Sequence, residues 1–327
     1  MALLFGGLCG GPDDGNADKP FKVHNDTWTF DDKRNWRQIN PTVVPPNRFM
    51  HAMANGLNGT AIVWGGLSAA VKNNKEKEQA GALGDLWIYR NSTEEWAELA
   101  QTASSKKDGT PSARSFHKMA VFKPDSFDTS KSPLIVMFGG RKSNNKDTNE
   151  TWVLDITHNT GKATDTLQAQ WFLVKPTVAP SKRTGHAMSR LGKNSVVLFG
   201  GYDAATQEVL GDTWVFVGAE QKSASWINVQ PKDGALSTAA SVITGVEYPP
   251  ARRFASFGSF DSETAMMFGG STETNFETNR YSPFSDGSVW HLSRNTDNIS
   301  VPVNKRCTCR LACCCLCLHF STRPDCY

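Results

Sequence analysis

The side chains best suited to metal chemistry lie in two parts of the sequence. Three histidines, His51, His117 and His186, stand in similar surroundings, each three residues after an arginine. Seven of the eight cysteines lie between Cys307 and Cys326, together with His319. Imidazole and thiolate groups are the usual protein ligands of zinc. Each group of residues therefore raises the hypothesis of a metal site.

The cysteine-rich C-terminal part admits three interpretations. The cysteines from Cys307 to Cys317 do not form the paired C-x₂₋₄-C arrangement typical of zinc sites. An acylated membrane anchor would use the apolar run Leu311–Phe320, which Lys305 and Arg306 precede. We favour the third interpretation, in which residues 294–327 are a disordered or artefactual tail.

The three histidines are better explained by structure than by catalysis. Three imidazoles around a central channel could bind a metal. Each, however, follows its own arginine, and these arginines are Arg48, Arg114 and Arg183. A pair that occurs once per unit indicates one bonding role per unit. We therefore expect no catalytic, cofactor-binding or metal-binding residues here, and no cofactor.

Other signatures of catalysis are missing from the sequence. It contains no G-x-S-x-G nucleophile elbow, no G-x-x-x-x-G-K-[ST] phosphate loop and no H-E-x-x-H pair. Asn-x-Ser/Thr sequences occur at Asn25, Asn58, Asn91, Asn149 and Asn298. These would matter only in a secreted chain. We therefore do not predict an enzyme.

The elements that position these residues are repeated along the chain. An apolar run followed by a glycine doublet occurs five times, ending at Gly7, Gly66, Gly140, Gly201 and Gly270. After each doublet comes an Asp, Asn or Glu phrase with a tryptophan, as in NDTWTF, GDLWIY, NETWVL, GDTWVF and DGSVWHL. A second tryptophan follows in the first four repeats: Trp36, Trp96, Trp171 and Trp226. An arginine phrase precedes the last four doublets: NRFMHAMA, ARSFHKMA, KRTGHAMS and ARRFASFG.

Each repeat is typical of four short strands. Its runs are short, β-branched or aromatic, and bounded by Gly, Asn, Asp, Pro and Ser. Four-stranded units of one design favour a radial arrangement that protects strand edges. The doublet would end a buried strand where backbones approach closely. The tryptophans would fill the space between sheets, and an Asp or Asn before the first tryptophan would bond nearby backbone.

These ordered features resemble the kelch repeat, which implies an all-β, kelch-type β-propeller with four-stranded antiparallel blades. The resemblance covers residues 1–293, with about five repeat cores: 1–40, 46–100, 111–175, 180–230 and 249–293. It also implies blade-to-blade hydrogen bonding by the histidines. The doublet spacings of 59, 74, 61 and 69 residues exceed the kelch period of roughly 50. The last arginine phrase places Ser256 where the others have histidine, and Trp290 departs from the usual spacing.

The first and last repeats are incomplete in the sequence. MALLFGG corresponds to the second strand of a repeat whose first strand is missing. After Leu292 there is no tryptophan-containing fourth strand. We therefore expect an incomplete or open propeller.

Charge and hydropathy exclude several classes of protein. The formal net charge is +3, and four of the basic residues lie after residue 304. Such a balanced body gives no reason to expect a nucleic-acid partner. No apolar run reaches the roughly 18 residues of a membrane span. Met1–Leu4 lacks the positive head of a signal peptide. A cytoplasmic location is slightly favoured, with membrane contact only if the tail is acylated.

The favoured function is a non-catalytic protein-interaction scaffold that binds a protein partner through variable loops on one face. Long loops on a rigid framework commonly carry binding. The candidate loops are 67–82, 100–110, 230–248 and 271–285, and a further long excursion, 157–170, leaves the opposite face. Two alternatives remain. One is a galactose-oxidase-like or other carbohydrate-acting enzyme, although no Tyr, His and Cys cluster matches its site. The other is an extracellular adhesion or recognition domain.

Overall fold

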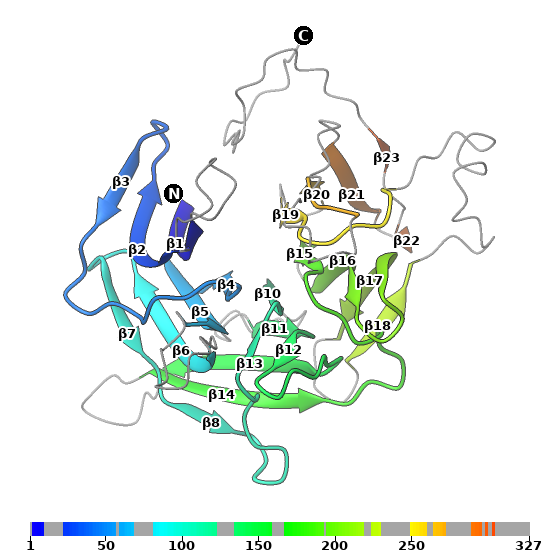
Figure 1. Ribbon diagram of the computed structural model, residues 1–327, viewed down its shortest axis with the longest axis horizontal. Helices are drawn as coiled ribbons and strands as arrows, with labels where there is room; N and C mark the ends of the chain where they lie inside the picture. Colours follow the sequence, from blue (N-terminus) through cyan, green and yellow to red (C-terminus); the bar gives the residue numbers. More distant parts are fainter. Residues whose placement is uncertain are drawn as a thin grey trace.

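Five sheets follow one another around a common centre in the computed structural model (Figure 1). The structure describes residues 2–9, 22–56, 59–68, 81–122, 134–158, 167–192, 194–218, 224–229, 249–259, 264–272, 289–295, 298–299 and 303–304. Within these ranges the regular elements are all strands, and nearly all pairs are antiparallel. The described chain contains no helix of the length and apolarity that crossing a membrane requires.

The first two sheets show the basic unit. The first contains β1 (Ala2–Cys9), β2 (Lys22–Phe30) and β3 (Trp36–Ile39), in that order. The second contains β4 (Ala52–Asn55), β5 (Thr60–Leu67), β6 (Ala82–Arg90) and β7 (Glu95–Glu98). Consecutive strands pair as a meander, so the first sheet lacks the counterpart of β4 among the described residues. This agrees with the incomplete first repeat that the sequence indicates.

The remaining sheets repeat this order. The third contains β10 (Lys118–Phe122), β11 (Leu134–Phe138), β13 (Thr151–His158) and β14 (Leu167–Val174). A short pair, β9 (Arg114–Ser115) with β12 (Arg141–Lys142), lies beside it. The fourth contains β15 (Ala187–Leu191), β16 (Ser195–Asp203), β17 (Glu208–Val217) and β18 (Ser225–Asn228). The fifth contains β19 (Ser256–Ser259), β20 (Thr264–Phe268), β21 (Val289–Asn295), β22 (Asn298–Ile299) and β23 (Val303–Asn304).

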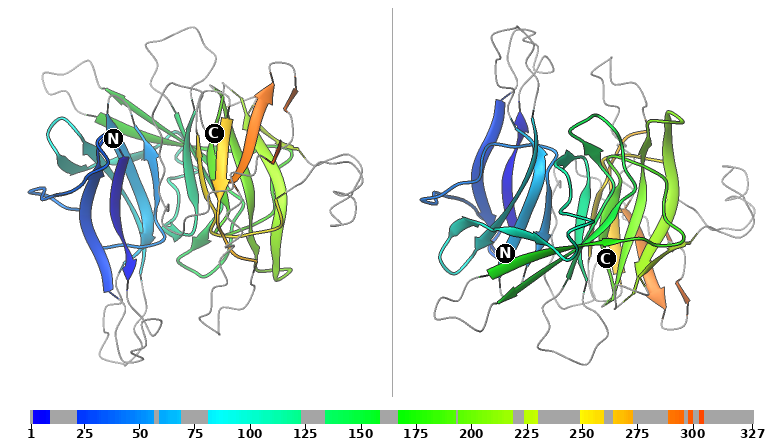
Figure 2. Two further views of the ribbon diagram at one scale, coloured as in Figure 1. Left: turned by 90° about the horizontal axis from the view of Figure 1, so that it is seen from above. Right: turned by 90° about the horizontal axis from the view of Figure 1, so that it is seen from below.

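The sheets are arranged radially. Figure 1 shows β4, β10, β15 and β19 innermost in their sheets, and neighbouring inner strands contact one another. Figure 2 shows most strands lying roughly along one common axis, with long green strands of the third sheet tilted across it. The all-β, antiparallel architecture is consistent with a β-propeller. No described strand of the first sheet pairs with one of the fifth.

The hydrophobic core lies between sheets, which explains the continuous apolar runs before the doublets. Along β5, Ile62 and Trp64 pack in a cluster with side chains of the third sheet. Val63 points the other way and packs with Phe5 of the first sheet. All three β5 residues are fully buried. A strand covered on both faces needs apolar residues at every position.

Two elements differ from the sequence-based expectation. Residues 100–110 were expected to be a variable loop, yet they contain β8 (Gln101–Ala103), which pairs in parallel with β14. The fifth repeat was expected to lack a fourth strand, yet β23 pairs with β21 through Trp290 and Asn304. Both strands are very short and contain no tryptophan, so the repeat pattern gave no signal for them.

Candidate functional site: the repeated arginine clamp and the sheet junctions

A buried arginine joins the inner phrase of each complete sheet to the strand that follows the doublet. The Arg48 side chain is completely buried. Its Nη1 and Nη2 donate to the two carboxylate oxygens of Asp85 at 2.8 and 2.6 Å. Nη1 also donates to the Gly65 carbonyl at 3.0 Å, and Nε to the Pro46 carbonyl at 3.1 Å. We call this arrangement the arginine clamp.

The clamp recurs in the fourth sheet with nearly the same geometry. Arg183 donates to Asp212 at 2.6 and 2.8 Å, to the Gly200 carbonyl at 3.0 Å and to the Ser181 carbonyl at 3.2 Å. In the fifth sheet Arg252 donates to the Pro250 and Gly269 carbonyls. Trp290 pairs with Met267 as Trp87 does with Val63, and the position two residues before it, Ser288, lies outside the described residues.

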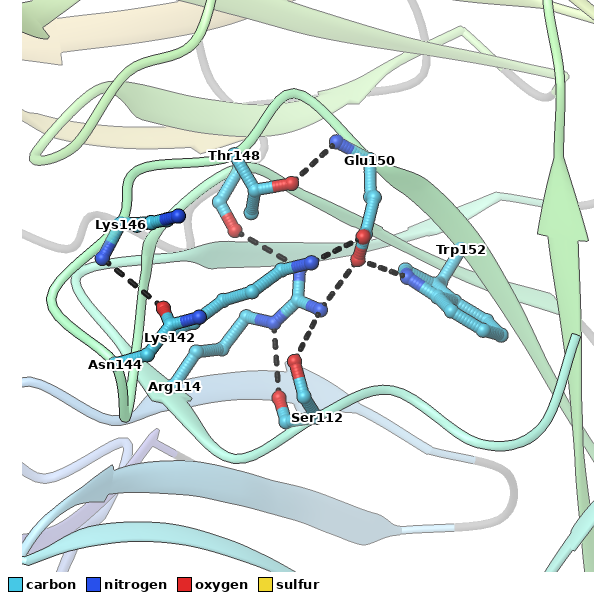
Figure 3. A network of polar contacts seen from close by, with 9 residues as sticks. Ser112, Arg114, Lys142, Asn144, Lys146, Thr148, Glu150 and Trp152 are labelled. Atoms are coloured by element: carbon cyan, nitrogen blue, oxygen red, sulfur yellow. Dashed lines mark hydrogen bonds and ion pairs between the residues drawn. The ribbon is translucent and has the colours of Figure 1, made fainter.

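The third sheet has a glutamate version of the clamp (Figure 3). Arg114 Nη2 donates to Glu150 Oε2 at 2.6 Å, and Lys142 Nζ forms a second ion pair with Oε1. Burial alone raises the pKa of Glu150, but the hydrogen bonds from Lys142, Trp152 and Arg114 outweigh it and lower the pKa to about 2. This carboxylate is therefore charged at neutral pH.

The first tryptophan of each repeat binds the same carboxylate. Its indole N–H donates to the acid two residues earlier: Trp28 to Asp26, Trp87 to Asp85, Trp152 to Glu150 and Trp214 to Asp212, over 2.6 to 3.0 Å. The sequence predicted that this acid would bond nearby backbone at the start of its strand. Asp85 does make such a backbone hydrogen bond, but the main partners of these acids are the arginine and the indole, which the sequence did not predict. Strand pairing across the sheet brings the arginine and the carboxylate together.

The second tryptophan links neighbouring sheets in the second and fourth repeats, whereas Trp36 of the first repeat is exposed. The indole N–H of Trp96 donates to Thr27 Oγ1 of the preceding sheet at 3.0 Å. Trp226 donates to Thr151 in the same way at 2.9 Å. These tryptophans therefore do fill the space between sheets, as the sequence predicted, and they also form a hydrogen bond across it.

Gln101 replaces the threonine at the junction between the second and third sheets. Leu86 stands where the other phrases have Thr27 and Thr151. Gln101 Oε1 accepts from the indoles of Trp64 and Trp171 at 2.9 and 2.8 Å. Its Nε2 donates to the Gly84 carbonyl at 2.8 Å. Sequence reasoning missed this residue, although the leucine in a threonine position signalled an altered junction.

The doublets allow a close approach of backbones, as expected. A Cβ on Gly65, where φ is +68°, would lie 2.8 Å from the Arg114 carbonyl of the next sheet. A Cβ on Gly66, where φ is +99°, would lie 2.7 Å from the Phe49 carbonyl of its own sheet. Both the space and the backbone conformation favour glycine. The doublet is thus the contact point for two arginine phrases.

The three histidines join sheets by ring packing. Each imidazole stands edge-on to the aromatic residue before the preceding doublet, as His117 does to Trp64, with ring centroids 5.0 Å apart and planes at 81°. His186 packs on Phe138, and His51 on Phe5. The electrostatics of each imidazole also include a backbone hydrogen bond with that same aromatic residue, Phe5, Trp64 or Phe138. These contacts with the preceding sheet agree with the blade-to-blade hydrogen bonding that the resemblance implies, although the ring nitrogens of His117 and His186 do not reach full hydrogen-bond geometry with the described residues.

The fifth sheet also requires a correction at this position. Ser256 was expected to replace the histidine. Arg252 makes the clamp contacts, so the residue three positions later is Ala255. Gly270 confirms this alignment, since its Cβ would meet Ala255, as that of Gly140 would meet His117. Two adjacent arginines, Arg252 and Arg253, made the sequence alignment ambiguous.

The electrostatics around the histidines disfavour a metal ion. Burial, followed by the charges of Arg48 and Lys118, lowers the pKa of His51 to about 4. Burial likewise lowers the pKa of His117 and His186. Lys118, on the inner strand β10, acts on all three histidines. The described residues contain no group of three potential metal ligands.

Most of the predicted binding loops cannot be placed. Residues 69–80, 230–248 and 273–288 lie outside the described residues, as do the tail cysteines from Cys307 onward and His319. At the base of the first loop, the Ser68 N–H donates to the Gly81 carbonyl at 2.9 Å. The segment 69–80 therefore starts and ends at one closed backbone contact.

Comparisons with known proteins agree with the kelch resemblance. No family model matches the chain. An F-box/kelch-repeat protein of Arabidopsis thaliana is 25% identical over 236 residues, which are 69% of this chain and 42% of that protein. Adagio-like protein 3 of Oryza sativa subsp. japonica is 27% identical over 172 residues, 52% of this chain and 22% of its own length. Adagio protein 3 of Arabidopsis thaliana is 25% identical over 242 residues, or 72% and 32%.

The chain spans less than half the length of these relatives. Among solved structures, that of YjhT matches with a TM-score of 0.58 and 14% identity, covering 93% of this chain and 80% of YjhT. This likeness concerns the fold alone. It supports the radial all-β architecture.

Proposed function

We propose that this chain is a non-catalytic protein-interaction scaffold of the kelch-repeat type, which binds a protein partner through variable loops on one face. We assign residues 1–293 to its five-repeat propeller unit and residues 294–327 to the tail, in which β22 and β23 pair with β21. The names of the relatives support the proposal, since they include kelch repeats.

The observation that carries the proposal is the use of the repeated polar side chains. Every described carboxylate of the tryptophan phrases accepts an indole N–H, and Asp85, Glu150 and Asp212 also bind a buried arginine. These groups hold the sheets together and so are not available to a substrate. A rigid framework of this kind leaves recognition to its connections.

The segment 69–80 is the best candidate connection. It contains the charged sequence KNNKEKE at residues 72–78, and the Ser68–Gly81 contact closes its base. It joins β5 to β6, whereas residues 159–166 join β13 to β14. In successive antiparallel strands these two kinds of connection leave opposite ends of the sheet.

A loop exchange tests the proposal. Residues 69–80 are replaced by a Gly-Ser linker in one variant, and residues 159–166 in a matched control. Partners are captured by quantitative crosslinking and mass spectrometry from the native source. We expect at least one partner to be lost from the first variant and retained by the control. Partners retained equally by both variants would contradict binding through the loop face.

A further inference from the structure

Among the described residues, no strand occupies the inner position of the first sheet. In the other sheets, the strand before the doublet pairs on both edges, as β5 does with β4 and β6. The same holds for β11, β16 and β20. Within the described residues, β1 pairs only with β2. The backbone groups of its second edge thus pair with no described strand, and such an edge can accept another strand.

Part of an arginine clamp, the carboxylate with its tryptophan, is present beside this edge. Trp28 Nε1 donates to Asp26 Oδ2 at 2.6 Å, the same length as the bond from Trp87 to Asp85. Asp85 is also bound by Arg48, whereas no described arginine contacts Asp26. His24 Nδ1 lies 3.9 Å from Asp26 Oδ1. The Asp26 carboxylate is thus placed to accept hydrogen bonds from an arginine, but no described guanidinium binds it.

The glycine doublet gives independent evidence for the same vacancy. A Cβ on Gly66, Gly140, Gly201 or Gly270 would lie within about 3 Å of the inner phrase of its own sheet. A Cβ on Gly7, where φ is +112°, would meet no atom within 4 Å. Gly7 keeps the backbone conformation of its counterparts although nothing described lies in front of it.

We propose that the edge of β1, with Asp26 and the Gly6 carbonyl, is a binding site for an extended segment of another polypeptide that carries an arginine. The segment adds an inner strand, and its guanidinium completes the clamp with Asp26. Strand addition of this kind draws affinity from backbone hydrogen bonds and specificity from side chains. The proposal does not depend on the loop face, because this edge lies at the inner side of the first sheet.

The occupied sheets define the chemistry of the segment. The residue four positions after the arginine pairs with the aromatic residue before the doublet, as Ala52 does with Trp64 and Ala187 with Phe199. It would pair with Phe5 in the first sheet. The next residue is methionine or phenylalanine in all four inner strands: Met53, Met119, Met188 and Phe257. The segment is therefore Arg, any three residues, a mostly small residue, then a large apolar residue.

A peptide with the sequence of residues 45–56, PPNRFMHAMANG, is the appropriate probe, because it contains one arginine and fits this pattern. Its binding to the full chain is measured by fluorescence anisotropy. The matched peptide carries Arg48→Ala. The protein variants are Asp26→Ala and, as a control, Asp32→Ala, which removes an exposed carboxylate from the same sheet.

We expect saturable binding of the arginine peptide and at least about tenfold weaker binding of the alanine peptide, the effect of losing hydrogen bonds to a charged group. Asp26→Ala should weaken the binding of the arginine peptide to the level of the alanine peptide. Asp32→Ala should leave the binding of both peptides unchanged. Hydrogen exchange should slow at the amides of β1 when the peptide binds. No binding, equal binding of the two peptides, or protection away from β1 would overturn the proposal.

Discussion

Arg48 and Asp85 meet through two parallel hydrogen bonds of 2.8 and 2.6 Å, with the guanidinium completely buried. This two-point geometry is the strong form of an ion pair. The two residues are 37 positions apart, so the pair fixes the inner phrase to a strand on the far side of the doublet. Its recurrence in Arg183 and Asp212 makes it a structural unit of the repeat.

Gly66→Ala should destabilise the protein more than Gly7→Ala. Both residues have positive φ, which costs an alanine of the order of 1–3 kcal/mol. Only at Gly66 would the Cβ also clash, 2.7 Å from the Phe49 carbonyl. Urea unfolding followed by tryptophan fluorescence measures both variants. Equal losses would show that an inner strand covers Gly7.

Gln101→Ala should reduce the free energy of unfolding by about 1–3 kcal/mol, because two buried indole N–H groups lose their acceptor. The other junctions provide the rescue. Leu86→Thr should place a hydroxyl near Trp171, as Thr27 is near Trp96. Leu86→Thr should therefore reduce the free energy of unfolding less in the Gln101→Ala variant than in the wild type. Strict additivity of the two changes would contradict the assigned junction.

His51→Ala should flatten the dependence of stability on acid pH. The pKa of His51 is about 4 in the folded protein, against 6.5 without burial. The unfolded chain therefore binds more protons between these values, and stability falls as the pH drops from 6.5 to 4. Unfolding curves at pH 7.5 and 5 measure the slope. The variant should lose less stability over this interval, and an unchanged slope would contradict the burial of the imidazole.

Glu150→Gln should reduce a second decline at lower pH. The folded pKa of Glu150 is about 2, against 4.5 without its partners. The lowered pKa stabilises the folded state above pH 4.5, and this contribution is lost as the pH falls toward 2. The variant lacks this part of the decline. Glu98→Gln, at an exposed position of β7, is the control and should keep the decline in stability of the wild type.

The sequence was sufficient to predict the main strands of each repeat and their radial arrangement, but not the short strands β8 and β23. Doublets, tryptophan pairs and arginine phrases recur in one order because each marks a close contact that every sheet repeats. The partner of each carboxylate was not predictable, since Arg48 and Asp85 meet only after three strands have paired. Local spacing suggested a contact with neighbouring backbone instead.

Positions where one repeat departs from the others were the hardest to predict. Gln101 lies in a connection between repeats, and its role follows from Leu86 in another strand. Arg252 and Arg253 were both candidates for the clamp arginine, and choosing Arg253 shifted the sequence alignment of the fifth repeat by one residue. The hydrogen bonds from Arg252 to Pro250 and Gly269, together with the approach of Gly270 to Ala255, distinguish them.

The most direct test of this account compares Asp85→Ala with Asp26→Ala in urea unfolding. Asp85→Ala leaves a buried guanidinium without its carboxylate and should cost about 3–5 kcal/mol. Asp26→Ala removes the acceptor of an unfilled clamp, so it should cost no more than about 1.5 kcal/mol, a typical hydrogen bond. Similar losses for the two variants would contradict a clamp that is occupied in the second sheet and vacant in the first.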